Sequence, residues 1–389
     1  MVYRIIRPMQ SNSFFLFGPR GSGKTTFLKN NFPNSDKILW IDLLDPSMED
    51  LYAQHPETLS HEIKGARLPL DWVIIDEIQK VPKLLNLVHF HIEDSELKFA
   101  LTGSSARKLK KGAANLLAGR AFVNYLFPLT HVELGDQFNL HDALQWGTLP
   151  KITQLPSAEE KNAYLRAYAL TYLKEEVWGE HIIRHLDPFR KFLEISAQCN
   201  GQIVNYHNIA IDAGVDTKTV QSYFEILEDT LVGFSLEPFH QSIRKRQRKN
   251  PKFFFFDTGV KRALEKTLTQ PLLPKSYGYG QAFEHFLILE IQRLNIYYQK
   301  DFSLSYLRTK DDAEVDLIIE RPGQPTALIE IKSTDHVDER DVRTLSRFVK
   351  DFKNAQAYCL SCDPRAKKIG EVSTLPWEEG IKVLGLVTS

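Results

Sequence analysis

The stretch Phe14-Phe-Leu-Phe17-Gly18-Pro-Arg-Gly-Ser-Gly23-Lys24-Thr25 decides the fold of the first third of the chain. Its leading residues, Phe14 to Phe17, are all apolar and predict a short buried strand. The glycine-rich segment that follows, Gly18 to Thr25, fits the pattern of a phosphate-binding loop in full. Such a loop leads into a helix, which we place from Lys24 to about Asn30. The alternative is a glycine-rich turn that caps a helix.

Each position of this loop has a chemical reason. Glycines allow the backbone to curl so that successive N–H groups point at phosphate oxygens, and the helix adds its positive dipole end. Lys24 is expected to reach the β- and γ-phosphates, and Thr25 to offer its hydroxyl to Mg²⁺. The sequence therefore predicts ATP and Mg²⁺ as cofactors. The predicted nucleotide-binding residues of the loop are Gly18, Pro19, Arg20, Gly21, Ser22, Gly23, Lys24, Thr25 and Thr26.

A pair of acids follows another strand of buried type, Trp72 to Ile75. Asp76 and Glu77 stand at its carboxyl end, which is where ligands bind in open α/β sheets. We expect Asp76 to hold Mg²⁺ through its water shell, and Glu77 to orient and deprotonate the attacking water. The alternative is a solvated acidic turn after a strand.

The segment Leu101-Thr102-Gly103-Ser104-Ser105 ends a further strand with hydroxyl groups. Thr102 or Ser104 is predicted to contact the γ-phosphate or the water, and ordinary turn chemistry is the alternative. Arg107 and Arg120 are candidates to neutralise transition-state charge, in the same chain or in a neighbour's site. An arginine that acts in a neighbour's site requires a homo-oligomer.

Short apolar strands alternate with helices throughout this region. Besides the strands named above, Lys37–Leu43, Lys98–Leu101 and Ala121–Leu126 have this character. The pattern predicts an α/β fold of the P-loop NTPase kind, with a parallel sheet that carries helices on both faces.

Length and charge limit the remaining possibilities. The chain has 389 residues, which favours two or three domains, and we place boundaries near residues 150 and 265. The predicted domains are therefore 1–150, 151–265 and 266–389. With 49 acidic and 49 basic residues the net charge is zero, so any contact with nucleic acid must come from a local patch.

Cysteine usage and hydropathy point to a cytoplasmic protein without a membrane partner. The three cysteines argue against a disulfide framework because their number is odd. Cys359 and Cys362 are interpreted as small apolar residues near a strand rather than as a metal or redox pair. No apolar run approaches the roughly 20 residues of a membrane helix, and Met1–Gln10 lacks an apolar stretch of signal-peptide length.

The middle of the chain has a helical pattern that ends in a basic stretch. Ile203–Ala210, a break at Gly214 and Thr217–Leu227 predict a helix-turn-helix, with Asp216 as the N-cap of the second helix. Side chains near the start of that helix that suit a DNA groove are Thr217, Lys218, Thr219, Gln221 and Ser222. The basic stretch consists of Arg244, Lys245, Arg246, Arg248, Lys249 and Lys252. We expect residues 203–252 to contact DNA, with the basic stretch as a wing over phosphates. The alternative is a helical packing domain with a solvated basic loop.

The phosphate loop and several later motifs resemble the prokaryotic AAA-type ATPases that carry a C-terminal domain of unknown function, the DUF4143 group. The resemblance covers nearly the whole chain and implies an ATPase. Its other motifs are Val73-Ile-Ile-Asp-Glu-Ile-Gln79, Leu101-Thr-Gly-Ser-Ser105, Leu117-Ala-Gly-Arg-Ala121, Phe127-Pro-Leu129, Phe255-Phe-Asp-Thr-Gly259, Phe283-Glu284, Tyr306-x-Arg308-Thr309 and Glu314-Val-Asp316. One departure is Gly147-Thr148-Leu149-Pro150, where the family usually has two glycines.

An array of carboxylates and a lysine marks the C-terminal part. Glu330 and Lys332 lie two residues apart on a predicted strand and therefore share one face, while Asp316 lies on the preceding strand. Asp316 and Glu330, with Glu284 from an earlier helix, are expected to hold a divalent cation for phosphodiester attack. Lys332 is expected to stabilise the developing charge. The array resembles the restriction-endonuclease-like nuclease fold, and cross-strand salt bridges on a wet sheet face are the alternative.

Two functional hypotheses follow from these features. In the first, an AAA-type ATPase uses ATP and Mg²⁺ to move or load a winged-helix and nuclease-like tail on DNA. The predicted catalytic residues are Lys24, Glu77, Arg120 and Lys332. In the second, ATP controls a switch, and the tail binds DNA or a protein partner without cutting it.

Overall fold

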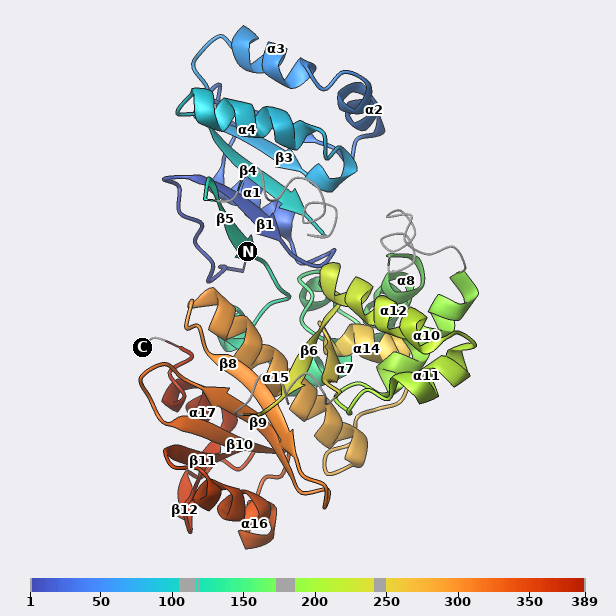
Figure 1. Ribbon diagram of the computed structural model, residues 1–389, viewed down its shortest axis with the longest axis vertical. Coiled ribbons are helices and arrows are strands. Elements are labelled where there is room, and N and C mark those ends of the chain that lie inside the picture. Colours follow the sequence, from blue (N-terminus) through green and yellow to red (C-terminus); the bar gives the residue numbers. More distant parts are fainter. Residues whose placement is uncertain (1, 105–116, 118, 173–185, 241–249, 388–389) are drawn as a thin grey trace. The chain divides into compact units, whose positions relative to one another are not determined.

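Strand β1 (Ser13–Phe17) lies inside a five-stranded sheet in the order β2-β3-β4-β1-β5 (Figure 1). The other strands are β2 (Ile38–Asp42), β3 (Trp72–Asp76), β4 (Lys98–Gly103) and β5 (Ala121–Tyr125). Every pairing in this sheet is parallel, as the alternation of strands and helices predicts.

Helices cover both faces of this sheet, which confirms the predicted α/β architecture. They are α1 (Lys24–Asn31), α2 (Pro46–Gln54), α3 (Thr58–Gly65) and α4 (Leu84–Asp94), with a 3-10 turn η1 (Ile78–Lys80). Successive strand residues point to opposite faces. Phe15 belongs to a core cluster with Leu84 and Val88 of α4 on one face. Phe14 stacks on Phe32, which directly follows α1, on the other.

The computed structural model describes residues 2–104, 117, 119–172, 186–240 and 250–387. The chain forms two compact units, Met1–Leu129 with Asp229–Val232, and Thr130–Glu228 with Gly233–Ser389. The domain boundaries near residues 150 and 265 stay predictions. Within the described part of the chain, every helix is too short or too polar to cross a bilayer.

The second unit is built on an eight-stranded sheet in the order β12-β13-β11-β10-β9-β8-β6-β7. Its strands are β6 (Gly233–Pro238), β7 (Lys252–Phe255), β8 (Ser303–Arg308), β9 (Glu314–Glu320), β10 (Thr326–Lys332), β11 (Ala355–Ser361), β12 (Lys367–Ile369) and β13 (Val372–Pro376). β8, β9 and β10 are antiparallel neighbours, and β11 pairs in parallel with β10. The β6–β7 hairpin joins the same sheet because β6 pairs in parallel with β8. One sheet therefore connects the predicted middle and C-terminal segments.

The helices of this unit include those of the predicted helix-turn-helix, α11 and α12. The larger helices are α7 (Leu140–Trp146), α8 (Ala158–Ala167), α10 (Leu186–Gln198), α11 (Tyr206–Ala213), α12 (Thr217–Asp229), α14 (Thr258–Leu264), α15 (Tyr277–Tyr297), α16 (Glu339–Phe348) and α17 (Trp377–Val383). The short ones are α6 (His131–Leu134), η3 (Gly135–Gln137), η4 (Ile152–Gln154), the π-helical turn η5 (Tyr168–Tyr172) and η6 (Val349–Asp351).

Candidate functional site

The phosphate loop connects β1 to α1 through glycines that no other residue replaces without strain. Gly21 has φ 78° and Gly23 has φ 95°, in the left-handed region. A Cβ on Gly18 would lie 2.1 Å from the carbonyl oxygen of Leu126, so this position also requires glycine. The loop can therefore curl at the carboxyl end of β1.

Polar groups of the loop are arranged to receive an anion. Lys24 is buried, and its Nζ donates to Gly18 O at 2.8 Å and to Pro19 O at 3.4 Å. The Ser22 hydroxyl is buried and has no hydrogen-bond partner among the described residues. A buried hydroxyl without a partner, two residues before a buried lysine, suits an incoming phosphate. The loop residues that are at least partly exposed are Arg20, Gly21, Gly23, Thr25 and Thr26.

Asp76 stands at the end of β3, next to the start of α1. Its Oδ2 accepts a 2.6 Å hydrogen bond from Thr25 Oγ1, and its Oδ1 accepts one from Thr102 Oγ1. Burial raises the pKa of the Asp76 carboxyl, and the two hydroxyl donors act in the opposite direction. The hydroxyl and the acid predicted to hold Mg²⁺ are thus within one hydrogen bond of each other, and their chemistry fits the ion.

The Thr102 hydroxyl supports the two acids at the end of β3. It donates to Asp76 and accepts from the backbone N–H of Glu77 at 2.9 Å, and the side chain is fully buried. Since a hydroxyl has one proton to donate, Thr102 orients the two acids through these two bonds. Its predicted contact with the nucleotide stays a prediction.

Glu77 is held by Gln79, the last residue of the motif that starts at Val73, for which the sequence pattern predicts no role of its own. Its backbone has φ 60° and ψ 48°, a left-handed conformation that non-glycine residues adopt at a cost. Lys24 Nζ lies 3.9 Å from Glu77 Oε1, and the buried Gln79 amide donates to Glu77 Oε2. The same amide donates to Ser104 Oγ at 3.1 Å, so Gln79 ties the acid to the end of β4. Its position two residues after Glu77 is the signal that the sequence offers.

Arg120 lies at the wrong end of the sheet for the nucleotide of its own chain. β5 pairs in parallel with β1 from Ala121 opposite Ser13, so Arg120 precedes its strand while the phosphate loop follows β1. A strand of 5 residues spans roughly 17 Å. Its guanidinium pairs with Glu93 instead. The role in the same chain is therefore corrected, and a role in a neighbour's site stays a prediction. Arg107 lies outside the described residues.

The second unit contains a cleft of about 530 Å³ where the predicted C-terminal residues meet. Glu284 of α15, Asp316 of β9 and Lys332 of β10 line it together. Asp316 Oδ2 accepts a 2.8 Å hydrogen bond from the backbone N–H of Ile331. Lys332 Nζ lies 2.6 Å from Glu330 Oε1, as expected for residues on one face of a strand. The residues that the sequence singles out are therefore neighbours.

Burial dominates the electrostatics of this cleft. It raises the pKa of Glu284 to about 7 and that of Glu330 to about 8, and it also raises the pKa of Asp316. No group of three or more His, Cys, Asp or Glu side chains in the described ranges is placed to hold a metal ion. The carboxylates are thus not arranged as the predicted metal site, because lysine ammonium groups meet them instead.

Lys252 belongs to this cleft and not to a phosphate-binding wing. It begins β7, its side chain is 4% exposed, and its Nζ lies 3.4 Å from Glu284 Oε1. It also contacts Glu314 Oε1. The prediction that Lys252 contacts DNA phosphates is therefore wrong, because a strand end and two acids enclose the side chain. The rest of the basic stretch, residues 244–249, lies outside the described part of the chain.

The helix-turn-helix has the capping that the sequence predicts. Gly214 ends α11 with φ 71°, and Asp216 Oδ1 accepts a 2.9 Å hydrogen bond from the backbone N–H of Thr219. Lys218 and Gln221 are exposed near the start of α12. The second helix thus offers polar side chains on its outer face.

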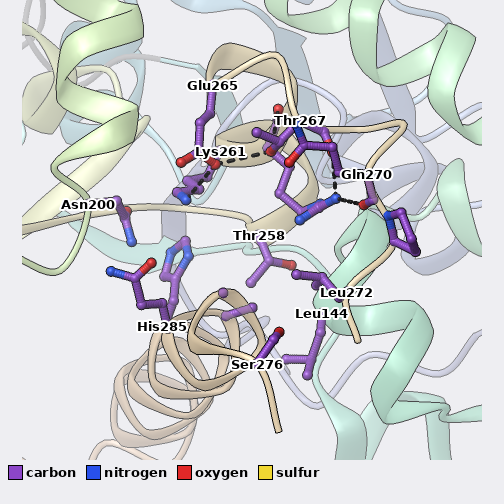
Figure 2. Close-up of a pocket in the computed structure, with 15 residues that line it drawn as sticks. Leu144, Asn200, Thr258, Lys261, Glu265, Thr267, Gln270, Leu272, Ser276 and His285 are labelled. Carbon is purple, nitrogen blue, oxygen red and sulfur yellow. Dashed lines mark hydrogen bonds and ion pairs between the residues drawn. The ribbon is translucent and has the colours of Figure 1, made fainter. Parts of the chain in front are cut away.

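A second pocket of the same unit, of about 240 Å³, is lined by charged groups that are already paired (Figure 2). Lys261 pairs with Glu265 at 2.7 Å, and Arg262 donates to the carbonyl oxygen of Thr267 at 2.6 Å. His285 Nε2 lies 2.6 Å from a carbonyl oxygen of β7. We assign no ligand to this pocket.

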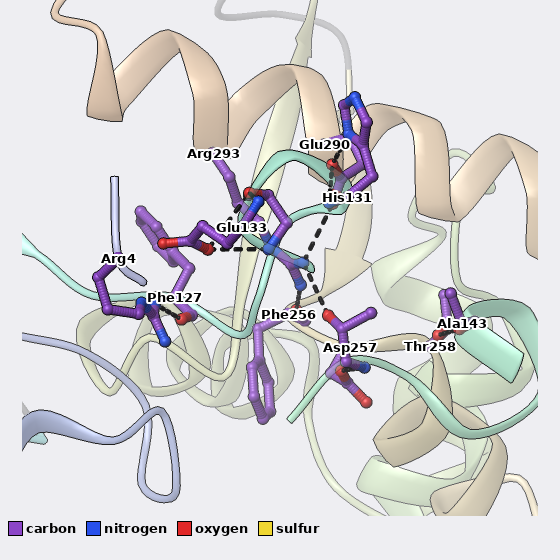
Figure 3. A network of polar contacts seen from close by, with 12 residues as sticks. Arg4, Phe127, His131, Glu133, Ala143, Phe256, Asp257, Thr258, Glu290 and Arg293 are labelled. Carbon is purple, nitrogen blue, oxygen red and sulfur yellow. Dashed lines mark hydrogen bonds and ion pairs between the residues drawn. The ribbon is translucent and has the colours of Figure 1, made fainter. Parts of the chain in front are cut away.

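A buried polar network joins the motif Phe255–Gly259 to the segment Gly147–Pro150 (Figure 3). The fully buried Asp257 accepts a 2.9 Å hydrogen bond from the backbone N–H of Thr148. Arg293 donates to Thr148 Oγ1 at 3.1 Å and to Phe256 O at 2.6 Å. A Cβ on Gly147 would lie 2.0 Å from Asp257 Oδ1. The motif around Asp257 therefore packs directly on Gly147 and Thr148.

The three cysteines lie in buried or partly buried positions. All three are free. Burial raises the pKa of the Cys359 thiol to about 12 and that of Cys362 to about 11, so both stay protonated.

Comparisons with known proteins support the assignment of the first unit. Residues 10–135 match the family described as AAA domain. We assign this segment as an ATP-binding domain of AAA type. Residues 137–270 and 279–379 match two domains of unknown function, DUF8612 and DUF4143.

Relatives along most of the chain are uncharacterized proteins. One from Mycobacterium tuberculosis is 28% identical over 321 residues, which cover 82% of this chain and 70% of the relative. One from Methanocaldococcus jannaschii is 23% identical over 368 residues, which cover 87% of this chain and 79% of the relative.

Two solved structures have weak likeness to this chain. The Aeropyrum pernix ORC2 protein, in ADPNP and ADP complexes, is 12% identical with a TM-score of 0.37, over 67% of this chain and 87% of that chain. The Aeropyrum pernix ORC1 protein in complex with DNA is 13% identical with a TM-score of 0.27, over 67% and 86%. These scores are too low to carry an argument.

Proposed function

We propose that the first unit binds ATP with Mg²⁺ and hydrolyses it. The observation that carries this proposal is the 2.6 Å hydrogen bond between Thr25 Oγ1 and Asp76 Oδ2, at the mouth of the phosphate loop. It joins the hydroxyl and the acid that a nucleotide-bound Mg²⁺ requires. The match of residues 10–135 to AAA domains supports the same function.

Each side chain of the site has a task in this reaction. Lys24 exchanges the Gly18 carbonyl for phosphate oxygens, which are stronger acceptors because they are charged. Thr25 and Asp76 would hold Mg²⁺, which would supply positive charge against that of the phosphates. Glu77 orients a water molecule and takes its proton, while Gln79 fixes the Glu77 carboxylate.

Calorimetry and phosphate release test this proposal in the full chain. Wild-type protein should bind MgATP, and Lys24→Ala should lose binding. Glu77→Gln should keep binding but lose turnover by about 100-fold or more. Wild-type turnover no higher than the Lys24→Ala background would favour a nucleotide-controlled switch. Failure of the folded wild type to bind MgATP would overturn both functions.

We also propose that the second unit contacts DNA without cutting it. α11, α12 and the β6–β7 hairpin follow one another in the order of a winged helix, and Lys218 and Gln221 are exposed on the second helix. The order α15-β8-β9-β10-α16-β11, with Asp316 and Glu330 on adjacent strands, supports a nuclease-like fold. The lysines that meet its carboxylates favour binding over cleavage.

Fluorescence anisotropy with a labelled duplex tests the DNA contact. Lys218→Ala combined with Gln221→Ala should weaken binding by about 10-fold or more, whereas the exposed Lys353→Ala should leave it unchanged. Equal binding by both variants would exclude α12 as the contact. Plasmid cleavage with Mg²⁺ or Mn²⁺ that is lost in Asp316→Ala would restore the nuclease prediction.

A further inference from the structure

The Lys252 ammonium group lies among the acids that line the cleft of the second unit. Its Nζ lies 3.4 Å from Glu284 Oε1 and in contact with Glu314 Oε1, and Asp316 adds to the negative field around it. The Tyr306 ring lies 5.5 Å from the same nitrogen. Lys252 is thus surrounded by anionic and π-electron-rich groups from α15, β8 and β9.

A buried lysine in such a place requires compensation, and the acids supply it. Desolvation alone would lower the pKa of Lys252, but the neighbouring carboxylates outweigh it and raise that pKa above its ordinary value. The side chain therefore stays charged. Removing one partner of such a cluster leaves an uncompensated buried charge, which is costly.

Among the residues that the structure describes, each of the other cations that line the cleft has its own acid. Lys332 Nζ lies 2.6 Å from Glu330 Oε1, and Arg308 lies 3.1 Å from the carboxylate of Asp312. Arg308 also lies 3.7 Å from Glu314. Glu284 has no basic side chain within ion-pair distance among the described residues apart from Lys252. Lys252 is therefore the cation on which the inner part of the cleft depends.

We propose that Lys252 is the built-in cation of this cleft, in the place that a divalent ion would take among Glu284, Glu314 and Asp316, and that it keeps the wild-type cleft from binding one. The arrangement disagrees with the metal site that the carboxylates and the nuclease-like topology imply. The disagreement comes from the β6–β7 hairpin, which lies outside that topology and inserts Lys252. The proposal is independent of ATP hydrolysis and of DNA binding.

Mn²⁺ titration followed by electron paramagnetic resonance of the free ion tests this proposal. The full chain is used without nucleotide and with Asp76→Asn, which removes the acid of the phosphate-loop site from the measurement. Lys252→Met in this background should gain one Mn²⁺ site at least tenfold tighter than any in the parent, and Asp316→Asn should abolish it. The exposed Lys310→Met serves as the matched control and should resemble the parent.

The other outcomes would overturn the proposal. If the parent binds Mn²⁺ as tightly as Lys252→Met, the lysine does not exclude the ion. If Lys252→Met folds and binds no Mn²⁺, the lysine does not occupy a cation position. Should Lys252→Met fail to fold, Lys252→Gln keeps a donor for one carboxylate and serves instead. Its melting temperature should rise with Mn²⁺ while that of the parent does not, and equal responses would again contradict the proposal.

Discussion

The Thr25 hydroxyl donates to Asp76 Oδ2 across 2.6 Å, and this bond joins the first turn of α1 to the last residue of β3. Parallel strands end at the same edge of a sheet, so the loop after β1 and the acids after β3 are brought to one place. The bond connects the phosphate loop to Asp76 and Glu77, the two acids that Thr102 and Gln79 hold in position. Replacing one of these two supporting side chains should therefore alter turnover more than nucleotide affinity.

Replacing Gln79 should reduce turnover while leaving ATP affinity intact. Gln79→Leu removes the amide that donates to Glu77 Oε2 and Ser104 Oγ, but keeps a side chain of similar size. A carboxylate that is no longer fixed is misplaced for the attacking water, so we expect kcat to fall by about 10- to 100-fold with KM nearly unchanged. Steady-state phosphate release measures both constants.

Ser104→Ala is the matched comparison for this variant. It removes one acceptor of the Gln79 amide but leaves the bond to Glu77, so its kcat should fall less than that of Gln79→Leu. A rise in KM without a fall in kcat would show that Gln79 serves nucleotide binding instead.

Asp76→Asn should stabilise the nucleotide-free protein. Burial raises the pKa of Asp76 above its ordinary value of 3.8, so ionisation is easier in the unfolded chain than in the fold. The contribution of Asp76 to the free energy of unfolding is therefore present in acid and is lost as the pH rises past 3.8. The loss is complete at neutral pH. A gain of about 1 kcal/mol would raise the melting temperature by roughly 2–4 °C.

Differential scanning calorimetry at neutral pH checks this expectation. MgATP should stabilise the wild type but no longer stabilise Asp76→Asn, because the variant lacks the acid for Mg²⁺. A melting temperature below that of the wild type without nucleotide would contradict the inferred cost of burial.

Gly147→Ala should destabilise the second unit strongly. Gly147 has φ 75°, and a Cβ there would lie 2.0 Å from Asp257 Oδ1, so backbone strain and a steric clash combine. We expect a loss of about 3 kcal/mol or more in the free energy of unfolding. Gly323→Ala is the control, because its φ is 72° but no described atom lies within 4 Å of its Cβ. It should cost about 1–2 kcal/mol, and similar losses in urea unfolding would contradict the clash.

Acid should destabilise the second unit through His285. Burial lowers the pKa of His285 to about 3, so the ring stays neutral in the fold while the unfolded chain takes a proton below 6.5. Stability from this group is therefore present above 6.5 and is lost as the pH falls toward about 3. The loss should reach about 2 kcal/mol near pH 5.

His285→Gln keeps a donor for the β7 carbonyl and cannot take up a proton. Its free energy of unfolding should therefore decline less in acid than that of the wild type, as chemical denaturation across the pH range would show. His207→Gln, at an exposed histidine, should follow the wild type. Identical acid profiles for all three proteins would exclude His285 as the cause.

Local patterns in the chain already predict the strands of the first unit and the nucleotide loop. Ser13–Phe17, Trp72–Asp76 and Ala121–Tyr125 lie within a residue of the predicted strands, because apolar runs and alternation act over a few neighbours. The glycines from Gly18 to Gly23 and the cap at Asp216 are equally local. These features depend on backbone conformation and on side chains close in sequence.

The roles of Thr102, Gln79, Arg120 and Lys252 could not be derived in the same way. Thr102 and Gln79 meet Asp76 and Glu77 across two strand ends, and Arg120 is placed by the register of β5 against β1. In the sequence, Lys252 is one more basic residue of the predicted wing. In the structure, β6 pairs with β8, and this pairing brings β7 beside the acids of the C-terminal strands. The sequence by itself determined the phosphate loop, the acids and the strand pattern, since these are short-range. Tertiary structure alone decided which side chains support the acids and which cation neutralises the cleft, because burial and pairing depend on residues far apart in the chain.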